Sequence, residues 1–296
     1  NWNPYENYGL YYKNTNGSFS NTSTALFPTH ASAAVFTGDF NGDGYLDIVY
    51  PNWRIGSNYT LDSFVFAGGP DGMDSNVDWF LPTSGAFGGS AGDVNNDGYD
   101  DIVFASIRNT TGYSINSTLY YGGPNGLDNT TALNFPTQGA TDCAIVDVNR
   151  DGLKDIVFAN AYNGSSGNIN SSVFLNNGAG FNATPDISLF AQNPYAVEAA
   201  DLNKDGWVDL LFANSMNTSM ALPGAYHIDS FIYYGSPVGF SSVPDVKLPT
   251  HGTLDAKVAD LNQDGWLDVV FANYNDGATF NTLSSAYFGS SSGFSS

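Results

Sequence analysis

The segment GDFNGDGYLDIVYPN, residues 38–52, sets the pattern from which the rest of the chain can be interpreted. Four further segments share its D-x-N-x-D-G-x-x-D motif followed by an apolar run. They are GDVNNDGYDDIVFAS (92–106), VDVNRDGLKDIVFAN (146–160), ADLNKDGWVDLLFAN (200–214) and ADLNQDGWLDVVFAN (259–273). The first aspartates of successive motifs are 54, 54, 54 and 59 residues apart. A fixed period of this length is typical of propellers, solenoids and repeat arrays.

The stretches between the motifs repeat as well. Each contains an aromatic run, such as LYYGGPNGL (119–127), and a second run, such as LNFPT (133–137). Gly, Pro, Asn and Ser separate these runs, which gives about four short strands per period and no amphipathic helix. We therefore predict an all-β fold, a β-propeller of about five four-stranded blades, with residues 1–296 forming a single repeat domain.

Composition narrows the possible partners. The chain has 296 residues, with Lys+Arg 8, Asp+Glu 29 and a net charge of −21. So few basic residues cannot neutralise a phosphate backbone, which argues against nucleic acid, and no apolar run is long enough for membrane insertion. The single cysteine, Cys143, excludes an intrachain disulfide, so metal ions become a candidate source of rigidity.

The acidic motif has the spacing of a calcium loop. Ca²⁺ takes six to eight oxygen ligands, and alternate residues of a tight loop point inward at positions 1, 3 and 5. Glycine at position 6 turns the chain, the main-chain carbonyl at position 7 faces the ion, and the carboxylate at position 9 completes the site. Position 12 is Tyr or Phe in every copy, so these loops are not EF-hands. The alternative is a metal-free Asx-rich turn, and five complete copies argue against it.

We predict about five bound Ca²⁺ ions, one in each of the loops 39–47, 93–101, 147–155, 201–209 and 260–268. The predicted ligands are Asp39, Asn41, Asp43, Tyr45, Asp47, Asp93, Asn95, Asp97, Tyr99, Asp101, Asp147, Asn149, Asp151, Leu153, Asp155, Asp201, Asn203, Asp205, Trp207, Asp209, Asp260, Asn262, Asp264, Trp266 and Asp268. Extracellular calcium modules commonly bind at about 10⁻⁴–10⁻³ M, which is adequate only outside the cell. This favours an extracellular, secreted protein.

On these loops the chain resembles the FG-GAP/VCBS repeat family, which includes the integrin α-subunit propeller and some fungal propeller lectins. The stretch AFGGSAGD (86–93) is most similar to the family's FG…GAP segment, and other copies replace FG. The resemblance implies four-stranded blades with Ca²⁺ in the loop between the first two strands of each repeat. It also implies non-catalytic recognition or adhesion, and it does not transfer a ligand site.

The two ends of the chain leave the closure of the ring open. Each acidic loop accounts for one first and one second strand, but the aromatic third-type strand occurs six times, including 8–13 and 285–289. One alternative is that these two strands are shared in closing a five-bladed ring. The other is that they are exchanged between subunits in a head-to-tail assembly, because a surplus edge strand is a template for pairing.

No constellation typical of catalysis is found. His30 and His251 occupy a position that is Ser or Gln in other repeats, His227 lies in the longest variable loop, and the aspartates are used as ligands. The chain lacks a nucleophile elbow, a zinc motif and a phosphate loop, so we predict that it is not an enzyme. Trp53 and Trp79 are weak ligand candidates, with packing between blades as the alternative. Cys143 is expected to be a buried structural thiol.

Ten Asn-x-Ser/Thr sites avoid the acidic loops and fall mostly in turns. They are Asn16, Asn21, Asn58, Asn109, Asn116, Asn129, Asn163, Asn170, Asn182 and Asn217. In a eukaryotic protein they predict a glycosylated surface, whereas in a bacterial one they reflect loop composition.

Taken together, the sequence predicts a calcium-stabilised, non-catalytic extracellular protein that recognises glycans or surface proteins. The alternative is a structural glycoprotein subunit of an extracellular filament or matrix, assembled head-to-tail with copies of itself by strand sharing.

Overall fold

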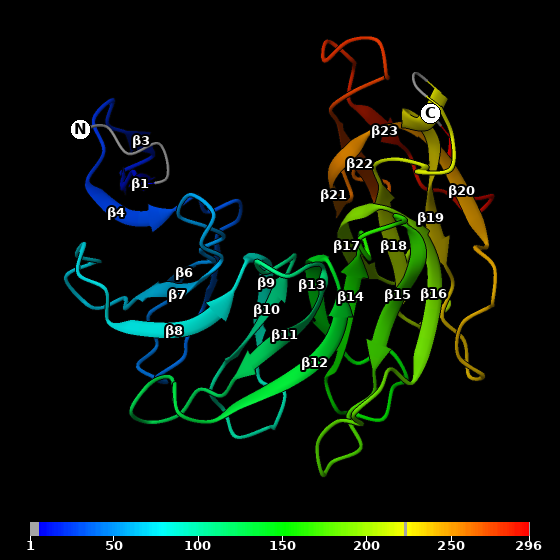
Figure 1. Cartoon of the computed structure of the whole chain (residues 1–296). Helices are drawn as coiled ribbons and strands as arrows, with labels where there is room; N and C mark the ends of the chain where they lie inside the picture. Colours follow the sequence, from blue (N-terminus) through cyan, green and yellow to red (C-terminus); the bar gives the residue numbers. More distant parts are fainter. Residues whose placement is uncertain (1–5, 222–223, 296) are drawn as a thin grey trace. The chain divides into compact units, whose positions relative to one another are not determined.

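The computed structural model describes residues 6–221 and 224–295, and nearly all of its regular structure is β-strand (Figure 1). In this described part the only helical element is a short 3₁₀ turn, η1 (Gly224–Tyr226), and no helix is long and apolar enough to cross a bilayer. The chain divides into two compact units, residues 1–135 and 136–296. The all-β prediction is confirmed.

The first unit contains sheets whose strands follow one another along the chain. The pairs β1–β4 and β2–β3 come first, followed by the four-stranded sheets β5-β6-β7-β8 and β9-β10-β11-β12. The strands are β1 (Glu6–Tyr11), β2 (Asn14–Thr15), β3 (Ser18–Phe19), β4 (Ala25–His30), β5 (Phe36–Gly38), β6 (Asp47–Tyr50), β7 (Thr60–Phe66), β8 (Trp79–Ser84), β9 (Ala86–Gly92), β10 (Asp101–Ser106), β11 (Ser114–Tyr120) and β12 (Ala132–Gln138), the last of which crosses into the second unit.

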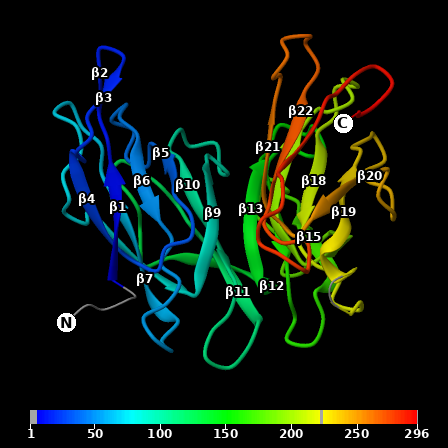
Figure 2. The ribbon, with the colours of Figure 1, turned by 90° about the horizontal axis from the view of Figure 1, so that it is seen from above.

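The second unit continues the same pattern with two four-stranded sheets, β13-β14-β15-β16 and β17-β18-β19-β20, and a three-stranded sheet, β21-β22-β23. Figure 2 shows β21 and β22 as neighbouring orange strands. The strands are β13 (Ala140–Val146), β14 (Asp155–Asn160), β15 (Asn168–Phe174), β16 (Ile187–Gln192), β17 (Pro194–Ala200), β18 (Asp209–Asn214), β19 (His227–Tyr233), β20 (Val246–His251), β21 (Thr253–Ala259), β22 (Asp268–Asn273) and β23 (Ser285–Tyr287).

Burial explains why the second strand is a continuous apolar run in the three middle repeats. All six residues of β10, β14 and β18 are buried. Strands covered on both faces lose the alternation of a half-exposed strand. By contrast, the outermost strand β8 alternates between buried and more exposed residues, as a strand with one solvated face does.

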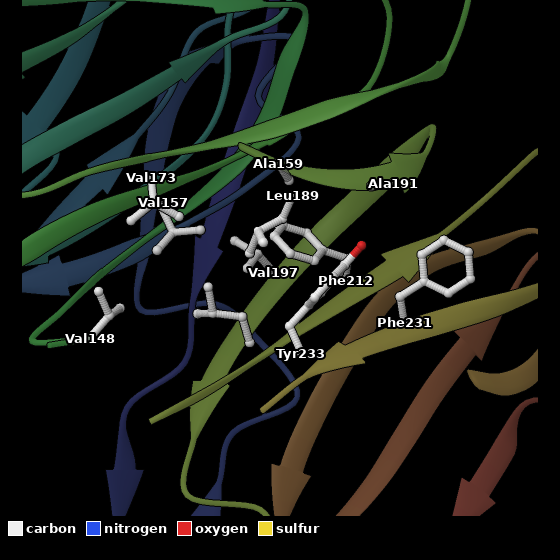
Figure 3. Packing of buried hydrophobic residues seen from close by; sticks show 11 residues of the cluster. Val148, Val157, Ala159, Val173, Leu189, Ala191, Val197, Phe212, Phe231 and Tyr233 are labelled. Carbon is white, nitrogen blue, oxygen red and sulfur yellow. The ribbon is translucent and has the colours of Figure 1, made fainter. Parts of the chain in front are cut away.

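The core of the second unit forms where adjacent sheets meet. Val157, Val173 and Leu189 from one sheet pack with Phe212 and Tyr233 from the next (Figure 3). The Tyr233 hydroxyl donates to the Phe190 carbonyl on the preceding sheet at 2.7 Å. A buried aromatic residue therefore ends the third strand because its ring fills the core, and a tyrosine there also links neighbouring sheets.

The terminal strands pair in the same register as the third strands of the complete sheets, with bounds that differ from the expected 8–13 and 285–289. Among the described strands β1 pairs only with β4, and Gly9 lies opposite Phe27 just as Ser63 lies opposite Leu81 in the complete sheet. β23 pairs with β22 as a third strand, with Val269 opposite Tyr287. Both ends therefore carry a third-type strand, at 6–11 and 285–287. Closure into a five-bladed ring and the single repeat domain stay predictions.

Candidate metal centres

All five acidic loops lie between the first and second strands of a sheet. In each loop the first aspartate directly follows the first strand, and the ninth-position aspartate begins the second strand. In the loop 147–155 the backbone is left-handed at Arg150 (φ 60°) and Gly152 (φ 88°), which turns the chain twice within five residues. Glycine adopts this conformation without strain, whereas Arg150 does so at a cost.

Side-chain oxygens hold each loop in shape. Asp147 accepts hydrogen bonds from the main-chain N–H of Asp151 (3.2 Å) and Gly152 (2.9 Å). Asn149 Oδ1 accepts from Asp151 N at 3.0 Å, and Asp151 Oδ1 accepts from Leu153 N at 2.9 Å. The other four loops repeat these contacts. The oxygens of positions 1, 3 and 5 are therefore gathered by the local turn.

The ninth-position aspartate has an additional role that the sequence did not reveal. Asp155 is fully buried, its Oδ2 accepts from Val148 N at 2.9 Å, and its Oδ1 accepts from Asn176 N at 2.9 Å. The carboxylate thus joins the start of its loop to the turn after the third strand. The same paired contacts are made by Asp47, Asp101, Asp209 and Asp268.

Burial perturbs these carboxyl groups. Desolvation raises the pKa of Asp155 to about 6, although the hydrogen bonds from Asn176 and Val148 lower it. The pKa of Asp101 is raised to about 7 for the same reason. A buried carboxylate favours its neutral form unless a cation or enough N–H donors offset the lost hydration. Burial raises the pKa of four of these carboxyl groups, which therefore need such compensation to stay ionised: Asp47, Asp101, Asp155 and Asp209.

The donor set of each loop fits calcium by its chemistry. Carboxylate, amide and main-chain carbonyl oxygens are hard ligands, and three aspartates per loop supply the negative charge. Across the described residues, however, no group of three or more His, Cys, Asp or Glu side chains is arranged as a metal site. The ligand assignments and the number of ions therefore stay predictions.

Adjacent loops contact each other within each unit. In the first unit, Asp39 N donates to Asp100 Oδ2 of the next loop at 2.9 Å. In the second, the Arg150 guanidinium lies 5.2 Å from the centre of the Trp207 ring, and the Lys204 ammonium lies 4.3 Å from that of Trp266. Position 4 of one loop therefore places its side chain over position 7 of the next, so Trp207 and Trp266 take part in contacts between sheets.

The remaining candidate residues separate into packing and surface positions. Trp79 packs against the core of the first unit, and Cys143 is buried. Trp53 is half-buried in the connection between β6 and β7. His227 and His251 lie opposite each other on β19 and β20, with ring centres 4.8 Å apart. The His30 ring packs edge-on against Phe64.

The recurring sequons have a structural reason. Asn109 Oδ1 accepts from the main-chain N–H of Thr111 (2.8 Å) and Gly112 (3.0 Å), and Asn163 accepts from Ser165 and Ser166 in the same way. These are Asx turns, for which Asn followed by hydroxyl residues is well suited. Whether any of the ten sites is glycosylated stays a prediction.

A buried asparagine at the end of the second strand was missed as a functional position. Asn160 Oδ1 accepts from Gln138 N at 3.1 Å, and its Nδ2 donates to Asn170 O and Ser172 Oγ. The same residue recurs as Asn52, Asn214 and Asn273, each accepting from the end of a fourth strand. The recurrence of Asn at the same distance after the acidic loop is the sequence signal that indicates this position.

Comparison with known proteins now identifies the repeat. The model of the FG-GAP-like repeat family matches residues 2–50, 93–158 and 147–212, which together span more than half of the chain. The chain belongs to the FG-GAP-like repeat family. The predicted resemblance is confirmed, and the FG-GAP-like match at 147–212 starts at the first aspartate of the third loop and ends within β18.

The solved structures similar to this FG-GAP-like chain include the following two, and no curated protein matches it. The crystal structure of the V. cholerae biofilm matrix protein Bap1 is 16% identical, with a TM-score of 0.46, covering 90% of this chain and 38% of that one. The Bacillus licheniformis rhamnogalacturonan lyase PL11 is 15% identical, with a TM-score of 0.47, covering 89% and 54%. The chain thus spans about four-tenths and about half of the lengths of these proteins.

Proposed function

We propose that this chain is a calcium-stabilised, non-catalytic recognition module of an extracellular protein, built as a β-propeller of about five blades. The observation that carries the proposal is the acidic loop, which occurs five times between the first and second strands and is braced each time by a buried aspartate. Membership of the FG-GAP-like repeat family supports it. The partners proposed are glycans or extracellular proteins.

Metal binding can be tested through the tryptophans already present in two loops. Trp207 and Trp266 lie at position 7 and are half-buried, close to where an ion would bind. Tb³⁺ titration excited through tryptophan should give sensitised luminescence that Ca²⁺ displaces, and calorimetry should count about five sites. Asp205→Ala and Asp264→Ala should each remove one site, whereas Asp71→Ala, on an exposed surface, should remove none. Unchanged stoichiometry in both loop variants would contradict the assignment.

Recognition is tested on a glycan and extracellular-protein array with the protein in millimolar Ca²⁺ and after chelation. A hit that disappears on chelation supports the proposal, because calcium orders the loops that brace the sheets. The same glycans incubated with the protein should keep their chain length. A progressive release of new reducing ends would instead show an enzyme.

A structural role is the second candidate, and the terminal strands favour it. β1 and β23 both have third-strand register, and among the described residues β1 pairs only with β4 and β23 only with β22. β1 stands at the edge of a two-stranded sheet with β4, so its other edge suits pairing with a second copy. Light scattering should then show open-ended oligomers in Ca²⁺, and deletion of residues 1–20 should abolish them. Polymer that persists after this deletion would refute strand sharing.

A further inference from the structure

Two connections in the first unit lie at the end of their sheets opposite the acidic loops. Antiparallel strands reverse direction at each turn, so the β6–β7 and β10–β11 connections are at one end and the β5–β6 and β9–β10 loops at the other. These connections meet through side chains that contact one another from adjacent sheets. We call Trp53, Arg54, Tyr59, Phe87, Arg108 and Tyr113 the arginine–aromatic cluster.

The cluster is a continuous stack of rings and guanidinium groups. The Arg54 guanidinium lies 4.4 Å from the centre of the Trp53 ring. Trp53 in turn packs against Tyr59, with ring centres 6.3 Å apart, and edge-on against Phe87 at 5.7 Å. Arg108 lies 4.9 Å from the Tyr59 ring and 4.8 Å from the Tyr113 ring. Each arginine is therefore held in place by aromatic faces.

The repeat itself does not require this cluster. Arg54 and Arg108 both stand fifteen residues after the first aspartate of their loops, where the other repeats have Tyr162, Met216 and Asn275. They are two of the three arginines in a chain of net charge −21. Their shared position places one cation in each of two adjacent repeats, and the Trp53 and Tyr59 rings link the two. Structural bracing alone does not need two positive charges, since Tyr162 occupies the same place in the third repeat.

Arg108 keeps hydrogen-bonding capacity for a ligand. Arg108 Nε donates to the Asn109 carbonyl at 3.3 Å and Nη1 to the Tyr113 hydroxyl at 3.2 Å, and both acceptors are neutral. A guanidinium has five N–H donors, so further donors of this half-buried group remain for an anion. A guanidinium held over a ring is restricted in orientation, which suits bidentate pairing with a carboxylate.

We propose that the arginine–aromatic cluster binds an acidic polysaccharide, with uronate carboxylates pairing with Arg54 and Arg108. The half-buried rings of Trp53, Phe87 and Tyr113 beside the arginines favour a sugar over an acidic peptide, because C–H faces of sugar rings pack on aromatic surfaces. Charge complementarity is local, since the protein as a whole repels polyanions. This inference rests on the recognition role proposed above and names its ligand class.

The experiment measures binding of a hyaluronan decasaccharide, whose alternate sugars are uronates, by calorimetry in millimolar Ca²⁺. Wild type should bind it and should not bind its methyl ester, in which the carboxylates are neutral. Arg54→Gln and Arg108→Gln should each weaken binding about tenfold, as expected for losing one charge-assisted pair. Lys154→Gln removes the same charge from an exposed site outside the cluster and should leave binding unchanged. Binding of wild type should weaken with added salt.

Three outcomes would overturn the proposal. Equal binding by Arg54→Gln and wild type would show that the cluster is only structural, and equal binding of the methyl ester would exclude carboxylate recognition. Tighter binding of poly-glutamate than of the decasaccharide would assign the site to acidic peptides. If Arg108→Gln does not fold, Arg108→Lys replaces it in the experiment, because lysine keeps the positive charge but lacks the planar guanidinium group. If the array yields other calcium-dependent ligands while hyaluronan fails, the cluster proposal falls and the recognition role stands.

Discussion

The ninth-position aspartate allows the loop brace to be separated from metal binding. Asp155→Ala removes a fully buried carboxylate that accepts N–H groups from Val148 and Asn176, both at 2.9 Å. Val148 and Asn176 are themselves 4% and 6% exposed, so water cannot replace the lost acceptor. Two orphaned donors at about 1–3 kcal/mol each predict a loss of about 2–6 kcal/mol in the free energy of unfolding.

The comparison with Asp151→Ala makes this prediction specific. Asp151 is exposed, and its carboxylate organises only its own loop. Urea unfolding followed by fluorescence of Trp207 and Trp266 should show Asp155→Ala destabilised both in Ca²⁺ and after chelation. Asp151→Ala should lose stability mainly in Ca²⁺, because its proposed role there is that of a ligand. Asp155→Asn, which keeps one acceptor, should be intermediate. If Asp155→Ala unfolds at the same urea concentration as wild type after chelation, the brace is not a stabilising element.

Four other outcomes are expected. In metal-free protein, burial raises the folded pKa of Asp47, Asp155 and Asp209 to about 6 and of Asp101 to about 7. The folded state then binds more protons than the unfolded state between about pH 4 and 7, so the stability of the metal-free protein falls as pH rises through this window. Saturating Ca²⁺ should reverse this trend. A melting temperature of the metal-free protein that rises from pH 5 to pH 8 would contradict the prediction. Lys204→Gln should tighten Ca²⁺ binding in the loop 260–268 a few-fold, because it removes a cation over Trp266. Site-resolved Tb³⁺ luminescence measures this affinity, with Lys154→Gln as the control. Asn160→Ala should cost about 2–4 kcal/mol, since it leaves Gln138 N and Asn170 O without their buried partner; the same denaturation curves measure it, and a change below 1 kcal/mol would refute the role. Tyr233→Phe keeps the ring and loses the hydroxyl contact with Phe190 O, so the expected loss is about 1 kcal/mol, against no change for Tyr8→Phe on the exposed face of β1.

Local chemistry explains how much was predictable. The D-x-N-x-D-G-x-x-D loops could be placed between first and second strands because the turn signals and the strand-like apolar runs are contiguous in the sequence. The left-handed backbone at Gly152 and the inward oxygens of Asp147, Asn149 and Asp151 depend only on residues within the loop. The third-strand character of β1 and β23 was likewise visible, because it depends on a repeated aromatic pattern.

Contacts between distant segments were not predictable in this way. Asp155 accepts a hydrogen bond from Asn176, which follows the third strand of the same sheet. Arg108 packs over Tyr59, which belongs to the preceding repeat. The sequence by itself determined the repeat, the all-β class and the place of the acidic loops between first and second strands, since these follow from spacing and turn propensity. Only the tertiary structure decided that the ninth aspartate braces the fold and that two arginines share one aromatic stack. The physical reason is that both depend on how adjacent strands and sheets pack, and a periodic pattern does not encode which side chains face each other.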